Sequence, residues 1–235
     1  MKLETLLDQL FPQGRDVAFD GEYFHGQGRC GDAEVAVLGA RDGAAIGVEL
    51  AYRMAGGVLD VVRDQPGRPI LLLVDTVGQR LSRRDELLGI NGYMAHLAKC
   101  LDLARRNGHK VIGLVYSQAV SGGFLASSML ADACYALPAA EIRVMNLPAM
   151  ARVTKIPLER LQELAAQSPV FAPGVENYWR MGAIREVWDG DYAARLAAAL
   201  MADSAPGDRR ADGQARGGRL LADRVSRLVR DDVAA

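Results

Sequence analysis

The chain has 235 residues, 50% of them hydrophobic, and a formal net charge of -1. This length and hydrophobic content are enough for one buried core, and the near-neutral charge gives no indication of a nucleic-acid or membrane-surface partner. The cysteines Cys30, Cys100 and Cys134 lie far apart, which fits reduced thiols and no structural metal site. The chain opens with acids rather than a basic signal-peptide start, and no apolar run reaches membrane-spanning length. We therefore expect a single soluble, cytoplasmic domain.

The first third of the chain predicts two helices and three strands. Leucines at helical spacing predict a helix over 3–10, and short apolar runs predict strands over 17–19, 34–39 and 43–48. Apolar residues at helical spacing then predict a helix over 50–61. The glycine-rich segment 20–32 predicts a loop, and Arg41-Asp42-Gly43 predicts a hairpin turn.

The middle of the chain predicts two buried parallel strands, each followed by a helix. The runs 69–75 and 111–116 are continuously apolar, as in strands buried on both faces. A long amphipathic helix over 86–106 separates them, which argues for a right-handed crossover. The loops 76–79 and 118–123 follow the carboxyl ends of these strands, where open α/β sheets bind their ligands.

The second loop contains the elbow Ser121-Gly122-Gly123, which opens an apolar helix. The first amides of a helix have no acceptor within it, and glycines let a ligand approach the backbone closely. Such amides can stabilise an oxygen that becomes negative during a reaction. The alternative is a packing turn in which Ser121 is the N-cap and the glycines only relieve a close contact.

The last third of the chain alternates short elements with polar segments. The pattern predicts strands over 132–137 and 141–145, an irregular aromatic segment over 171–181, a turn and strand over 182–188, and helices beginning near Pro157 and spanning 192–201. The segment 204–218 is poor in apolar residues and predicts a flexible linker. The expected organisation is therefore a domain over 1–203, a linker over 204–218 and a C-terminal helix over 219–235.

Several motifs occur together in one order along about residues 35 to 201. They are Asp75-Thr76-x-Gly78, Glu86 to Ile90 in the long helix, the Ser121-Gly122-Gly123 elbow, Tyr135 to Met145, and Asn146 to Thr154. Together they resemble the carboxyltransferase branch of the crotonase and Clp superfamily, and within it the gamma subunits of malonate decarboxylases. Each motif is weak alone, whereas the ordered set is specific. In place of the proline that usually precedes the glycine of the first loop, this chain has Val77.

The resemblance implies a crotonase-type α/β spiral with a mostly parallel sheet, acting in a hetero-oligomer with a beta-type subunit. It implies decarboxylation of a malonyl thioester that an acyl carrier subunit presents on a CoA-derived prosthetic group, with no covalently bound cofactor in this chain. By this resemblance the catalytic positions are Gly122, Gly123 and Phe124: Gly123 and Phe124 supply amides at the start of the helix, and Gly122 permits close approach. The substrate-binding positions are Thr76, Gly78, Gln118, Ser121, Arg152 and Lys155.

Within this interpretation, two details stay open. The amides could hold either the thioester oxygen or a carboxylate oxygen, and the proton donor is not identified. Arg152 and Lys155 could meet an acidic carrier or the substrate carboxylate, or they could be solvated surface charges.

Three other functions remain as alternatives. The chain could be a carboxyltransferase subunit of a biotin-dependent complex, or a non-catalytic partner that only completes another subunit's site. A Clp-type serine protease would use Ser121 with a histidine base on the following strand. No histidine follows His109, which disfavours the protease.

Overall fold

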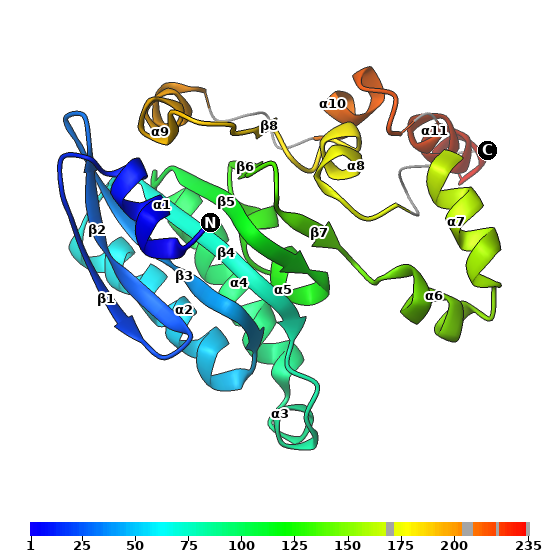
Figure 1. The fold of residues 1–235 in the computed structure, drawn as a ribbon, viewed down its shortest axis with the longest axis horizontal. Helices are drawn as coiled ribbons and strands as arrows, with labels where there is room; N and C mark the ends of the chain where they lie inside the picture. Colours follow the sequence, from blue (N-terminus) through cyan, green and yellow to red (C-terminus); the bar gives the residue numbers. More distant parts are fainter. Residues whose placement is uncertain (168–171, 204–208, 220, 234–235) are drawn as a thin grey trace.

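The strands form one mixed sheet in this computed structural model, which describes residues 1–167, 172–203, 209–219 and 221–233. Within the described residues the sheet has eight strands in the order β1-β2-β3-β4-β5-β6-β8, with β7 paired to β5 (Figure 1). The strands are β1 Arg15–Asp20, β2 Tyr23–Cys30, β3 Ala33–Ile46, β4 Ile70–Gln79, β5 Val111–Val120, β6 Ala133–Ala136, β7 Glu141–Arg143 and β8 Glu186–Val187. The pairs β1–β2 and β2–β3 are antiparallel, and the other pairs are parallel.

The helices fall into a group that covers the sheet and a group that extends from it. The first group comprises α1 Leu3–Leu10, α2 Val48–Asp64, α4 Ile90–Arg106, the short α5 Ser121–Leu125 and α9 Tyr192–Met201. The second comprises α3 Arg83–Leu87, α6 Leu147–Thr154, α7 Leu158–Gln167, α10 Arg210–Ala215 and α11 Ala222–Val233. The short helix α8 Val175–Arg180 packs against β7 and β8. The predicted helices near 3–10, 50–61, 158–165 and 192–201 and at the C-terminus are all present. The helix predicted over 86–106 begins only at Ile90, because Gly89, with φ 74°, separates α4 from α3, which ends at Leu87.

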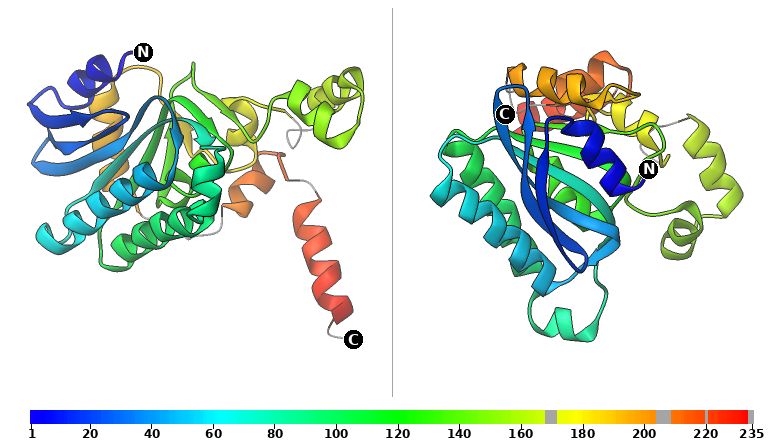
Figure 2. Two further views of the ribbon diagram at one scale, coloured as in Figure 1. Left: turned by 90° about the horizontal axis from the view of Figure 1, so that it is seen from below. Right: turned by 60° about the vertical axis from the view of Figure 1, so that its left-hand side comes forward.

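The two faces of the sheet bury separate hydrophobic clusters. Leucines of α1 and Leu196 of α9 pack on one face, together with Trp188. Met54 of α2 and Leu97 of α4 pack on the other face (Figure 2). Because β4 and β5 lie between these layers, their side chains are apolar on both faces, and this explains the uninterrupted apolar runs of the sequence.

The N-terminal sheet differs from the expectation at two places. The glycine-rich segment 20–32 contains the strand β2, which pairs with both β1 and β3. The predicted hairpin at 41–43 is wrong, because β3 continues through it and stays paired with β4 across register shifts between Ala40 and Ala45. Asp42 and Gly43, both with φ near 60°, form this bulge, so turn-forming residues bend the strand without reversing it.

Short helices occupy segments in which the sequence pattern predicts other structure. The helix α6 begins directly after β7, because the Asn146 side chain accepts a hydrogen bond of 2.8 Å from the Ala149 N–H and caps the helix. The helix α8 lies in the segment 171–181 that was predicted to be irregular, of which residue 171 falls outside the described residues. The helix α10 lies within the predicted linker, of which 204–208 fall outside the described residues; the division into domain, linker and C-terminal helix stays a prediction.

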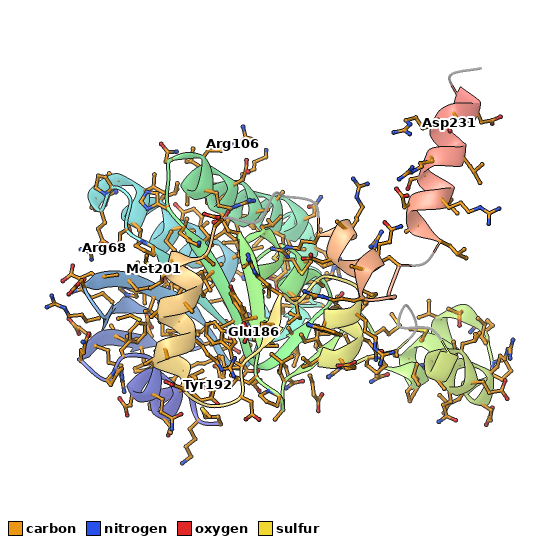
Figure 3. The ribbon with its side chains drawn as sticks, turned by 90° about the horizontal axis from the view of Figure 1, so that it is seen from above. Arg68, Arg106, Glu186, Tyr192, Met201 and Asp231 are labelled. Carbon is orange, nitrogen blue, oxygen red and sulfur yellow. The ribbon has the colours of Figure 1, made fainter. Side chains whose placement is uncertain are left out.

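The helices α6, α7 and α11 project from the body of the molecule (Figures 1 and 2). Figure 3 shows the contrast: α9, from Tyr192 to Met201, lies against the sheet, whereas α11, which carries Asp231, stands away from it. Among the described residues, no helix combines the length and the apolar content that crossing a bilayer requires.

Candidate active site at the ends of β4 and β5

The two segments that the sequence predicts as loops lie next to each other, although 76–79 are the last residues of β4 and 118–120 the last residues of β5. The strands β4 and β5 are parallel neighbours, and Thr76 pairs with Ala119 at their carboxyl ends. The predicted juxtaposition of 76–79 with 118–123 is therefore confirmed. It follows from topology, since parallel neighbours connected by a crossover helix end at the same edge of the sheet.

Thr76 holds the first loop in shape. Its buried hydroxyl donates a hydrogen bond of 2.6 Å to the Ala44 carbonyl and accepts one of 3.0 Å from the Gly78 N–H. This bond leaves the Gly78 N–H engaged within the protein. Thr76 thus shapes the loop from inside rather than presenting its hydroxyl to a ligand.

The glycines of the two segments pack closely against each other. A Cβ atom at Gly123 would lie 2.9 Å from Thr76 Oγ1 and 3.1 Å from the Gly78 Cα atom. Gly78 itself has φ 104°, a conformation that side chains rarely adopt. A Cβ atom at Gly122 would lie 2.7 Å from Gln79 Oε1. Backbone contacts and conformation therefore account for glycine at positions 78 and 123, whereas at Gly122 a side chain would meet only the end of the flexible Gln79 side chain.

The helix α5 begins at Ser121, immediately after the strand β5. In a helix with this start, the N–H groups of Gly122 and Gly123 have no acceptor in a preceding turn, whereas the Phe124 N–H faces the Val120 carbonyl. Among the described residues, no side chain or loop carbonyl accepts a hydrogen bond from Gly122 or Gly123. The available donors are therefore the two glycine amides. Phe124 instead contributes its buried ring, which packs edge-on against Tyr178 with centroids 6.0 Å apart.

Ser121 is not the N-cap, contrary to the alternative considered from the sequence. The capping position belongs to Val120, and no side chain caps the helix. Ser121 is the first helical residue and has φ 49°, a left-handed conformation that is unfavourable for a residue with a side chain. This conformation lies at the point where the strand β5 passes directly into the helix α5.

Asp75 has a structural role in this region that the sequence analysis did not predict. Its buried carboxylate accepts a hydrogen bond of 3.0 Å from the Gly43 N–H and one of 3.1 Å from the Gln118 N–H. One side chain thereby joins the ends of β3, β4 and β5. A carboxylate directly after a long apolar run was the available signal, since a buried charge needs such partners.

Gln118 was predicted from the sequence, and its side-chain partner Arg143 was not. The Gln118 Oε1 atom accepts a hydrogen bond of 3.1 Å from Arg143, which lies on β7 opposite Val120. Sequence spacing alone does not bring residues 118 and 143 together, because β7 joins β5 only through a parallel pairing.

The predicted residues Arg152 and Lys155 are not brought to the elbow. Both are exposed at the end of α6, which packs on α7 and projects from the sheet (Figure 1). They face solvent in this chain, so any role in binding requires a ligand or partner that reaches the projecting helices.

No histidine of the described chain contacts Ser121. His25 lies on β2 beyond β3 and β4, His96 contacts Cys100 on α4, and the buried His109 pairs with the Arg68 carbonyl at 2.9 Å. Burial raises the pKa of Tyr178, so this nearby phenol stays protonated and is no general base. The arrangement therefore lacks the base that a serine nucleophile requires.

Comparisons of the chain with known proteins find a family model and a curated relative. Residues 40–233 match the family model described as malonate decarboxylase gamma subunit. A curated relative, the malonyl-S-ACP:biotin-protein carboxyltransferase MADD of Malonomonas rubra, is 32% identical over 206 residues, which cover 78% of this chain and 70% of the relative.

Two solved structures of Pseudomonas malonate decarboxylase share the fold. A chain of the hetero-tetramer in complex with coenzyme A is 25% identical, with a TM-score of 0.78 and coverage of 97% of this chain and 98% of that chain. A chain of the MdcD-MdcE hetero-dimer is 26% identical, with a TM-score of 0.74 and coverage of 96% and 97%. The expected crotonase-type fold is confirmed.

Proposed function

The chain belongs to the malonate decarboxylase gamma subunit family, and on that premise we propose that its elbow stabilises the enolate formed when a malonyl thioester loses CO2. The observation that carries the proposal is the pair of unbonded amides at Gly122 and Gly123, locked against the Thr76–Gly78 loop. Fixed donors of this kind need no rearrangement when negative charge develops.

The chemistry requires little beyond these donors. The bond between the carboxylate carbon and the central malonyl carbon breaks, CO2 leaves, and the electron pair moves into the thioester as an enolate. The Gly122 and Gly123 amides stabilise the negative oxygen, and the central carbon then takes up a proton to give the acetyl thioester. Each oxyanion donor of this type is worth roughly 10²–10³-fold in rate.

We propose that the chain acts with a beta-type subunit and an acyl carrier subunit. Its relatives include a hetero-dimer and a carboxyltransferase named for a malonyl group on an acyl carrier protein. The carrier would present the malonyl group on a CoA-derived arm, which enters between the two large subunits. The exposed Arg152 and Lys155 on α6 would attract the acidic surface of the carrier.

The decisive experiment is turnover of a malonyl thioester by the purified chain, by its beta-type partner and by both together. We expect CO2 release only from the mixture. Release by the partner alone, at a rate that this chain does not change, would show that the chain takes no part in catalysis.

A biotin-dependent carboxyltransferase is a second candidate, because the curated relative carries that description. The two functions differ in the fate of CO2. Radiolabelled carboxyl carbon should appear as free CO2 in the absence of any biotin protein if the chain serves a decarboxylase. Label transfer to an added biotin protein, with no free CO2 before that addition, would support the carboxyltransferase.

A further inference from the structure

A cavity lies beside the elbow, between β7 and the segment that precedes α8. It has a volume of about 460 Å³, and its wall includes Glu141, Arg143 and Asn146. The strand β7 pairs with the last residues of β5, and Arg143 is opposite Val120, the residue before Ser121. The cavity and the elbow therefore share the end of β5.

Arg143 is held in this wall by a chain of hydrogen bonds. Its guanidinium donates to Gln118 Oε1 at 3.1 Å, and the Gln118 backbone is held in turn by the buried Asp75. Only 22% of the Arg143 side chain is exposed. The cation is thus fixed before any ligand arrives, which lowers the entropy lost on binding.

The present carboxylate partner of Arg143 is more exposed than Arg143 itself. Glu141, two residues earlier on β7, forms an ion pair with the guanidinium, and 65% of its side chain is exposed. An exposed pair of this kind contributes little stability, so a ligand carboxylate can replace Glu141 at small cost.

We infer that this cavity is a carboxylate subsite in which Arg143 binds the free carboxylate of the malonyl group. When no substrate is bound, Glu141 forms the ion pair with Arg143 instead. The inference rests on the proposed function, and it identifies Arg143 as the residue that distinguishes a malonyl thioester from an acetyl thioester. Arginine suits the task, because its planar donors match a carboxylate in a bidentate geometry.

The reaction predicts where the effect of Arg143 should appear. The carboxylate loses its charge as CO2 leaves, so an ion pair to it stabilises the bound substrate more than the transition state. Loss of Arg143 should therefore raise KM and leave kcat unchanged or higher. A purely structural role would lower kcat or prevent assembly instead.

The test uses the full chain assembled with its beta-type subunit, malonyl-pantetheine as substrate and acetyl-pantetheine as competitive inhibitor. Arg143→Met should raise KM for malonyl-pantetheine about 10- to 100-fold, with the Ki of acetyl-pantetheine unchanged. Arg143→Lys should give a KM between those of the wild type and Arg143→Met, because lysine keeps the positive charge but lacks the planar pair of N–H donors. Glu141→Gln should lower KM, since the internal competitor loses its charge.

Arg160→Met is the matched control, because Arg160 forms an exposed pair with Glu163 on α7, and it should match the wild type. Equal weakening of malonyl-pantetheine and acetyl-pantetheine by Arg143→Met would overturn the carboxylate assignment. So would a Glu141→Gln variant that folds, assembles and shows an unchanged or higher KM. Absence of turnover in the wild-type complex would instead refute the proposed function itself.

Discussion

At the scale of single residues, the elbow depends on atoms that are missing from its glycines. The Gly123 Cα faces Thr76 Oγ1 and Gly78 so closely that a side chain would push the two loops apart. The loops set the direction of the Gly122 and Gly123 amides. Activity should therefore be far more sensitive than folding to a side chain at this point.

We predict that Gly123→Val abolishes turnover, with a loss of at least about 10²-fold in kcat, while the protein still assembles with its partner. Turnover of a malonyl thioester and size-exclusion chromatography of the mixture measure the two effects. Gly56→Val on α2 is the control, since a Cβ atom there meets nothing within 4 Å. Full activity of Gly123→Val would contradict the assignment of the oxyanion donors.

Ser121 allows a second prediction, which differs from the one that an N-cap role would make. No cap bond is lost in Ser121→Ala, so stability and activity should change little. Ser121→Gly should raise the free energy of unfolding by up to about 1 kcal/mol, because it relieves the left-handed conformation at φ 49°. Chemical denaturation measures both variants. Labelling of wild-type Ser121 by an acylating serine reagent, with activity lost in a folded Ser121→Ala protein, would instead favour the protease.

At the scale of elements, a buried carboxylate ties the short helix α3 to the start of α2. Asp85 accepts a hydrogen bond of 2.8 Å from the Val48 N–H and another from the Ser82 hydroxyl. The Ser82 hydroxyl in turn accepts from the Asp85 N–H and caps α3. These hydrogen bonds, that of Ser82 first, lower the pKa of Asp85 below its ordinary value of 3.8.

The lowered pKa predicts the direction of a pH effect. A carboxylate with a lowered folded-state pKa contributes stability above its unfolded pKa and loses it as the pH falls through the folded value. Asp85→Ala should therefore lower Tm at pH 7, and the difference from the wild type should shrink below about pH 4. Asp102→Ala, at an exposed pair with Arg106, should have little effect at either pH. A difference for Asp85→Ala that persists undiminished at pH 2 would contradict the role of the charge.

At the scale of the whole molecule, apolar side chains remain exposed on the projecting elements. Examples are Val153 on α6 and Val225, Leu228 and Val229 on α11, each more than half exposed. Exposed apolar side chains grouped on protruding helices are typical of surfaces that bind other proteins. This distribution fits a subunit that works inside a larger assembly.

We therefore predict that the chain forms a stable complex with its beta-type partner and is inactive without it. Size-exclusion chromatography with light scattering, on each chain alone and on the mixture, measures assembly. Turnover of the same fractions shows whether activity follows the complex. A fully active monomer that gains nothing from the partner would contradict a site shared between subunits.

The sequence by itself determined the features that depend on local pattern. Uninterrupted apolar runs identified β4 and β5 because both faces of a central parallel strand are buried, and the 3.6-residue period identified α2, α4 and α9. The order of strands and helices is enough to place the segments of Thr76 and Gly122 at one edge of the sheet. The ordered motifs were enough to indicate the family.

Only the tertiary structure decided the features that depend on distant partners. The bulge at Asp42 and Gly43 allows β3 to stay paired with β4 instead of reversing its direction. Ser121 adopts φ 49° because the two loops interlock around it. Arg143 reaches Gln118 only because β7 joins the end of β5. Each depends on contacts between residues far apart in the chain, and local residue patterns do not encode which distant segments will meet.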